Sequence, residues 1–139
     1  MAAVTRGAGW LTSAGVYKKI LVGTDGSHTA AKAVDRAVEV ARIGGAELTI
    51  FSAGPRARAT QVVEGEAERL ASTGVSVSTL VSEGDAVSAL LDTARDGGFD
   101  LLVLGNRGMT GVTRFLRLGA VPNKVAHHIP CSLLIVKTT

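Results

Sequence analysis

The chain alternates short apolar runs with longer segments in which apolar residues recur at helical spacing. The apolar runs cover residues 20–23, 48–53, 75–82, 101–104 and 133–136. The four segments between them each predict a helix, and the first three show one apolar face. Strands that alternate with helices form a parallel sheet covered on both faces. We therefore expect one α/β domain with a doubly wound, five-stranded parallel sheet, which suits a length of 139 residues.

Glycines and capping residues mark the expected ends of the first two helices. Ser27 can cap the first helix, whose apolar stripe runs through positions 30–41, and Gly44-Gly45 ends it. The basic residues 56–58 are interpreted as a solvated loop that could also reach a phosphate. The second helix follows this loop and ends near Gly74. Its apolar face is expected to comprise Val63, Ala67, Leu70 and Ala71.

The later part of the chain continues the same pattern. Residues 75–82 alternate valine or threonine with mostly serine, which indicates a half-exposed strand at a sheet edge. Gly84-Asp85 opens the third helix and Gly97-Gly98 closes it. The last helix is expected over residues 121–128.

Composition limits which binding partners and which cellular compartment are expected. The net charge is only +3 and aromatic residues make up 4% of the chain, so nucleic acid is not an expected partner. No apolar run approaches the roughly 20 residues of a membrane helix, so no membrane partner is expected. The single cysteine, Cys131, allows no intramolecular disulfide and fits a cytoplasmic, reducing location. We interpret it as a buried structural thiol. Residues 1–15 are expected to form a flexible tail.

A glycine-rich segment after the fourth strand is the strongest chemical signal. In a doubly wound sheet, ligands bind at the carboxyl ends of strands where the strand order reverses. Glycines in residues 105–111 would let backbone N–H groups approach a phosphate, and a helix beginning near Gly119 would add its positive end. Arg107 could supply charge. The alternative is that these glycines only form turns.

Other chemistries fit the sequence poorly, so no catalytic residue and no metal site are expected. His127 and His128 are adjacent and would point about 100° apart on a helix, so they could not easily share one metal ion. The segment 25–29 lacks the second aspartate of a phosphatase motif of the D-x-D-x-T type. No G-x4-G-K-[ST] phosphate loop and no G-x-S-x-G elbow occurs.

Taken in order, several motifs resemble the universal stress protein family. They lie at residues 22–27, 84–85, 104–111, 121–125 and 130–136. The resemblance runs from about residue 16 to residue 139. It implies a nucleotide-binding domain over that range, with sheet order 3-2-1-4-5.

The resemblance also implies a set of site residues. Asp25 would hold the ribose hydroxyls, although it could instead cap the first helix. The backbone of Ala53 would read the adenine edge, Leu104 would pack on the nucleoside, and Thr24 would add backbone contacts. The phosphates would lie against Gly105, Arg107, Gly108, Gly119, Ala120 and Val121.

This chain departs from the family's G-x2-G-x9-G-[ST] motif at two points. Ten residues rather than nine separate Gly108 from Gly119, and Ala120 replaces the hydroxyl residue. Losing one hydroxyl contact costs about 1 kcal/mol, not the whole site. The resemblance therefore implies an adenine nucleotide: ATP first, accompanied by Mg²⁺, with ADP, AMP and cyclic AMP as alternatives.

These features predict a regulatory binding module of the stress response rather than an enzyme. One alternative is a stress protein that has lost nucleotide binding and acts through protein contacts. Another is a slow ATPase. The last strand, Ser132 to Val136, is apolar on both faces and would lie at a sheet edge. We therefore expect a homodimer that pairs this strand with its copy.

Overall fold

The computed structural model describes residues 16–106 and 121–138, and for residues 121–124 the backbone only. The tail expected over residues 1–15 lies outside this range. The elements are β1 (Lys19–Gly23), α2 (His28–Gly44), β2 (Glu47–Ala53), α3 (Arg56–Arg69), a 3₁₀ turn η2 (Ala71–Thr73), β3 (Val77–Ser82), α4 (Ala86–Asp96), β4 (Leu101–Gly105), α5 (Val121–His128) and β5 (Ser132–Val136).

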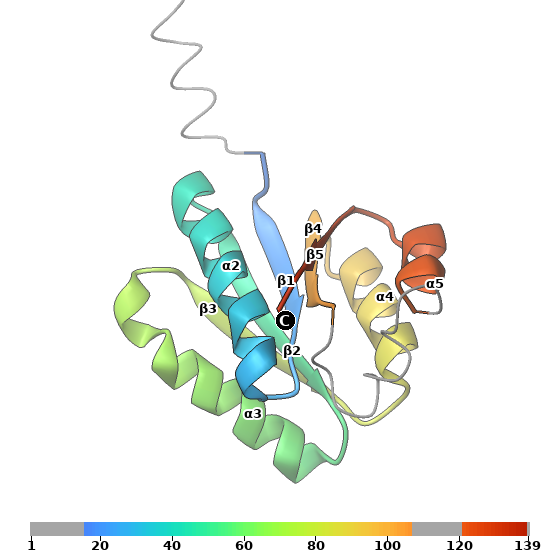
Figure 1. Cartoon of the computed structure of the whole chain (residues 1–139), viewed down its shortest axis with the longest axis horizontal. Helices are drawn as coiled ribbons and strands as arrows, with labels where there is room; N and C mark the ends of the chain where they lie inside the picture. The colour runs from blue at the N-terminus through green and yellow to red at the C-terminus, as the bar shows by residue number, and fades with distance from the viewer. Residues whose placement is uncertain (1–15, 107–120, 139) are drawn as a thin grey trace, which may run out of the picture.

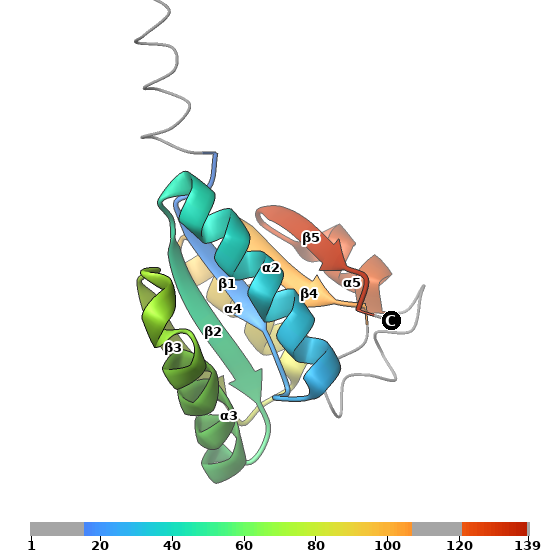
Figure 2. The same cartoon turned by 60° about the vertical axis from the view of Figure 1, so that its left-hand side comes forward.

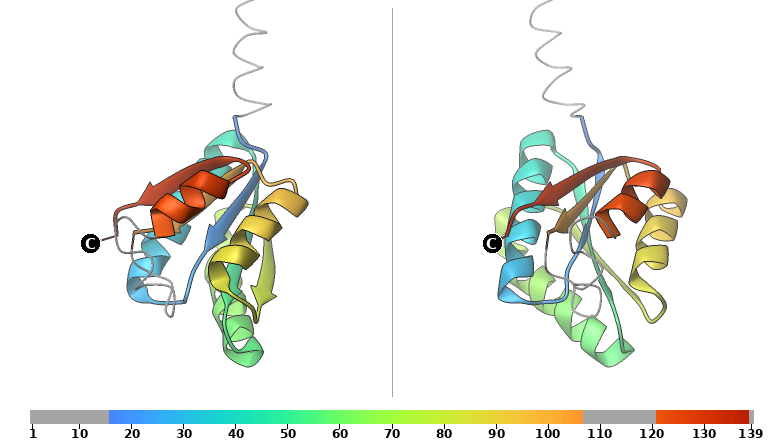
Figure 3. Two further views of the ribbon diagram at one scale, coloured as in Figure 1. Left: turned by 90° about the vertical axis from the view of Figure 1, so that its right-hand side faces the viewer. Right: turned by 45° about the vertical axis from the view of Figure 1, so that its right-hand side comes forward.

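The five strands form one parallel sheet in the order β3-β2-β1-β4-β5 (Figure 1). Helices α2 and α3 cover one face (Figure 2), and α4 and α5 cover the other (Figure 3). The predicted doubly wound α/β fold is therefore confirmed. The strand order reverses between β1 and β4: β1 leads to α2 on one face of the sheet and β4 leads to α5 on the other. A crevice that can hold a ligand forms at such a point.

The central strand β1 supplies both halves of the core. Ile20 and Val22 pack in the cluster beneath α2 and α3, whereas Leu21 packs in the cluster beneath α4. This is the alternation of side chains that any strand imposes. All three side chains are buried, which explains why the strand reads as a continuous apolar run.

The second helix differs most from the expectation. It begins at Arg56, so the basic residues 56–58 form its first turn and are not a loop. The reason is the connection from β2, which consists of Gly54 and Pro55 alone. Pro55 is the N-cap, with φ −53° and ψ 133°, so the helix begins at the very next residue.

The end of this helix and the start of the next strand also shift. Helix α3 stops at Arg69 and a 3₁₀ turn leads to Gly74, which has a φ of +81°. Leu70 is buried as expected, but Ala67 is only half-buried and Ala71 is exposed. Strand β3 begins at Val77 rather than at position 75.

Candidate functional site

The carboxyl end of β1 turns sharply into α2. The N–H of Thr24 donates to the carbonyl of Phe51 at 2.9 Å, which is the last hydrogen bond of the ladder between β1 and β2. The N–H of Gly26 donates to Thr24 Oγ1 at 3.0 Å. Gly26 has a φ of +80°, and a Cβ there would lie 3.0 Å from Cγ2 of Val62. The turn therefore requires glycine, and it brings the chain close to α3. Thr24 is buried and serves this turn.

Asp25 shapes the turn without capping the helix. Its Oδ1 accepts a hydrogen bond from the N–H of Ser27 at 2.8 Å. Ser27 is the N-cap of α2, since its Oγ accepts from the N–H of Ala30 at 3.1 Å, as predicted. The alternative role for Asp25, capping α2, is thus taken by Ser27. The half-buried carboxylate lies at the edge of a pocket.

This pocket opens at the carboxyl ends of β1 and β2 and has a volume of about 250 Å³. It unites two residues that were predicted separately from the sequence, Asp25 and Ala53. The residues that line it are Asp25, Ser52, Ala53, Gly54, Pro55, Arg58, Ala59 and Val62. Three of them belong to the first two turns of α3, and of these the sequence analysis considered only Arg58, as a possible phosphate contact.

Strand alternation fixes where the backbone of Ala53 points. The carbonyl of Phe51 faces β1, where it accepts from Thr24, and the N–H of Gly54 faces β3, where it donates to Ser82 at 2.9 Å. Neighbouring residues of a strand direct their backbone groups to opposite sides. The N–H and carbonyl of Ala53 therefore face the β1 side, beyond the last contact of that ladder. A ligand edge lying past the end of β1 would meet them.

The carboxyl end of β4 is anchored to the end of the chain. Gly105 pairs with Val136, and the N–H of Asn106 donates to the carbonyl of Val136 at 2.9 Å. Oδ1 of Asn106 accepts from both the N–H and the Oγ1 of Thr138, at 2.8 and 2.9 Å. These bonds set the direction in which the chain enters the glycine segment. The sequence analysis did not identify Asn106, because its partner lies 32 residues away.

The remaining predicted site residues are only partly described. Leu104 is 1% exposed and packs in the core cluster beneath α4, so its predicted contact with a nucleoside stays a prediction. Val121 begins α5. The other four lie outside the described residues: Arg107, Gly108, Gly119 and Ala120.

A family comparison decides what kind of domain this is. The model of the universal stress protein family matches residues 16–65 and 52–137. This chain belongs to the universal stress protein family. It is 30% identical to the universal stress protein YxiE of Bacillus subtilis, over 88% of this chain and all of that protein. It is 32% identical to a putative universal stress protein of Staphylococcus epidermidis, over 88% of this chain and 85% of the relative.

Solved structures resemble this universal stress protein over the same region. One is a universal stress protein in complex with cyclic AMP, with 28% identity and a TM-score of 0.72, covering 88% of this chain and 99% of that one. Another is protein Rv1636 from Mycobacterium tuberculosis H37Rv, with 38% identity and a TM-score of 0.62, covering 88% and 97%. A third, from Archaeoglobus fulgidus in complex with dAMP, is 17% identical with a TM-score of 0.70, covering 88% and 99%, and supports the fold alone.

Other chemical groups of this universal stress protein lie apart from the pocket. Cys131 is half-buried rather than fully buried, and burial, with a smaller effect of Asp100, raises the pKa of its thiol. Within residues 16–106 and 121–138, no three side chains of the His, Cys, Asp or Glu type gather as metal ligands. No helix in those ranges is long and apolar enough to cross a membrane.

Proposed function

We propose that this universal stress protein binds an adenine nucleotide, ATP in the first place, and acts as a regulatory module with little or no turnover. The observation that carries the proposal is the pocket shared by Asp25 and Ala53 beside the point where the strand order reverses. The structural relative solved with cyclic AMP, 28% identical to this chain, supports an adenine ligand. The single cysteine supports a cytoplasmic location.

The dimensions of the pocket suit the base and ribose rather than a whole nucleotide. Its volume of about 250 Å³ falls below the roughly 300–1,000 Å³ of pockets that enclose an entire ligand. The backbone of Ala53 would pair with the adenine edge, and the Asp25 carboxylate would accept from the ribose hydroxyls. The phosphates would then extend past β1 toward the glycine segment that follows β4. Mg²⁺ would neutralise part of their charge if the ligand is ATP.

The side chains of the pocket support binding more than catalysis. Among the described residues that line it, Asp25 is the one carboxylate and none is a histidine. Oδ1 of this carboxylate already accepts from the N–H of Ser27. A general base must reach the proton it removes, and a phosphate without a positioned base gains little acceleration. A slow ATPase is therefore the weaker alternative.

Titration calorimetry with ATP, ADP, AMP and cyclic AMP tests the proposal. At least one of them should bind with micromolar to submillimolar affinity. Gly108→Val should abolish this binding, because a side chain would occupy the path of the phosphates. If none of the four nucleotides binds at millimolar concentration, the result would instead support a stress protein that acts through protein contacts alone. The extra residue and Ala120 in the glycine motif would then account for the lost binding.

We also propose that the protein forms a homodimer through β5. Two properties of this strand support the pairing. It pairs with β4 on one side and is the last strand of the sheet on the other. Its side chains are mostly half-buried or exposed although all but Ser132 are apolar, and Ile135 is 36% exposed. An apolar edge of this kind favours association.

A further inference from the structure

Two arginines in the first turn of α3 have different surroundings. Arg56 forms an ion pair with Glu83, with 3.1 Å between Nε and Oε2. Arg58 lines the pocket together with Asp25 and Ala53. In the part of the chain that the structure describes, no carboxylate forms an ion pair with Arg58. The exposed Arg58 therefore has no acidic partner in that part of the chain, whereas Arg56 has one.

The fold places Arg58 above an apolar wall. Val62 follows Arg58 by four positions on the same helix, so their side chains lie on one face. Val62 and the buried Ala59 both line the pocket. The two-residue connection of Gly54 and Pro55 holds this helical turn directly beside the end of β2. A flat ring that reached the backbone of Ala53 would enter between this wall and the turn at Asp25.

The position of Arg58 in the sheet favours the base over the phosphates. Helix α3 begins at the end of β2, whereas the glycine segment follows β4, and β1 lies between these two strands. Two strand spacings amount to roughly 10 Å. A nucleotide whose phosphates lie over β4 would therefore present its base, not its phosphates, to the first turn of α3.

We propose that Arg58 is a ligand-binding residue that stacks its guanidinium on the face of the purine base. A planar guanidinium stacks on aromatic rings, whereas the compact ammonium of lysine does so less well. The inference rests on the proposed function and adds to it the residue that covers the base. Arg58 closes the open side of the pocket over the ring and retains its charge without forming an ion pair to a phosphate.

Calorimetry first identifies which of ATP, ADP, AMP and cyclic AMP binds the wild type most tightly. The affinity for that nucleotide is then measured for the wild type, Arg58→Ala, Arg58→Lys and Arg56→Ala. Each protein is measured at low and at high sodium chloride. Arg58→Ala should weaken binding by about 3- to 20-fold. The weakening factor should change little with salt, and Arg58→Lys should restore little of the affinity. Arg56→Ala, which removes the same charge from the same turn outside the pocket, should bind like the wild type. Thermal denaturation of all four proteins checks that they fold alike.

Three results would overturn the role of Arg58 while leaving the proposed function intact. One is wild-type affinity in Arg58→Ala. Another is full recovery in Arg58→Lys, which would show that charge alone matters. The third is a loss in Arg58→Ala that disappears at high salt, as expected for a screened contact to phosphate. A wild type that binds none of the four nucleotides would instead contradict the proposed function together with this inference.

Discussion

At the residue scale, Asp25 combines a structural and a proposed binding role in one carboxylate. Its Oδ1 holds the turn after β1 by accepting from the N–H of Ser27, and the side chain lines the pocket beside Ala53. The two roles respond differently to substitution. Asparagine keeps an oxygen that can accept from Ser27 but loses the charge, whereas alanine loses both.

We expect Asp25→Asn to weaken nucleotide binding with little change in melting temperature. Asp25→Ala should weaken binding by about 1–3 kcal/mol through loss of charge-assisted hydrogen bonds, and should also lower the free energy of unfolding by about 1 kcal/mol. Calorimetry and thermal denaturation measure the two effects separately. Nucleotide affinity equal to that of the wild type in both variants would place the ribose elsewhere.

At the element scale, β5 offers a defined set of backbone groups to a second copy. The carbonyl of Val136 accepts from Asn106 and the N–H of Ser132 donates to Asp100, so even-numbered residues face β4. By alternation, the N–H and carbonyl of Leu133 and Ile135 point away from the sheet. The edge that would pair in a dimer is therefore carried by two apolar residues.

Ile135→Pro should convert the dimer into a monomer, because it removes an outward N–H while leaving the bonds to β4 in place. Ile135→Lys tests the side chain independently, and Ile135→Val should remain a dimer. Analytical ultracentrifugation at tens of micromolar should show the wild type near twice the monomer mass. A monomeric wild type would refute the proposal, and so would a dimer that tolerates both the proline and the lysine.

The helices show where local patterns were sufficient and where they were not. Ser27 and Gly45 mark the ends of α2 in the sequence and in the structure, since a cap and a left-handed glycine act on their immediate neighbours. The start of α3 was predicted wrongly because the basic run at 56–58 resembles a loop, while the short connection makes the helix begin directly after Pro55. For the same reason the sequence analysis did not place Arg58 at the pocket, because that location depends on how α3 packs against β2.

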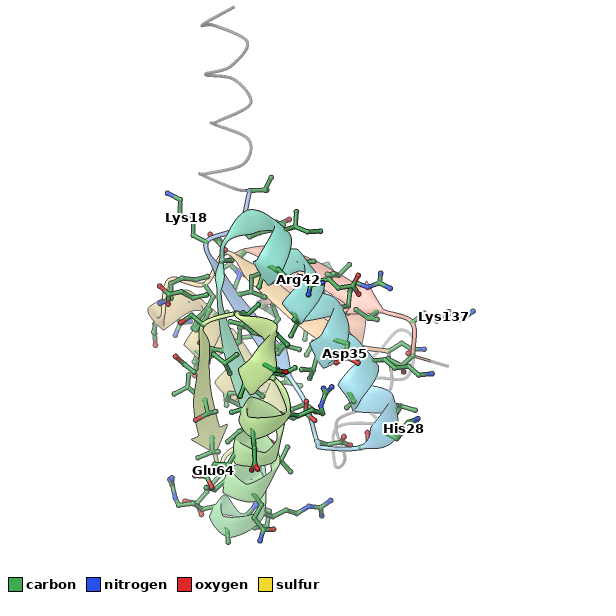
Figure 4. The ribbon with its side chains drawn as sticks, turned by 90° about the vertical axis from the view of Figure 1, so that its left-hand side faces the viewer. Lys18, His28, Asp35, Arg42, Glu64 and Lys137 are labelled. Atoms are coloured by element: carbon green, nitrogen blue, oxygen red, sulfur yellow. The ribbon has the colours of Figure 1, made fainter. Side chains whose placement is uncertain are left out.

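At the scale of the whole molecule, the alternation of strands and helices was enough to predict the parallel sheet, and the family resemblance supplied its order. Asp25 and Ala53, each named from the family resemblance, line one pocket because parallel strands end on the same side of the sheet. The Asn106–Thr138 contact was not predicted, because no local pattern links residues so far apart. The amino ends of the strands lie at the other end of the domain. Lys18, just before β1, and Arg42, in the last turn of α2, lie there, far from His28 in the first turn of α2 (Figure 4).

The whole molecule is expected to hold nucleotide without consuming it. Purified protein incubated with ATP and Mg²⁺ should release phosphate far below about 1 s⁻¹, the lower end of the usual enzyme range. The reason is that the described lining of the pocket offers one carboxylate and no histidine as a base. A coupled phosphate-release assay measures this rate, with Gly108→Val as the control for contaminating ATPases. Sustained turnover above that value, lost in the control, would make the protein an enzyme.

The two-residue connection between β2 and α3 has a consequence for the rate of recognition. Because Gly54 and Pro55 alone join β2 to α3, the wall formed by Ala59 and Val62 lies directly beside the strand that carries Ala53. In the proposed site, the half that would meet the base is therefore preorganised, and little conformational entropy would be lost there on binding. Association should consequently follow simple bimolecular kinetics as the base enters, without a preceding slow isomerisation of this wall.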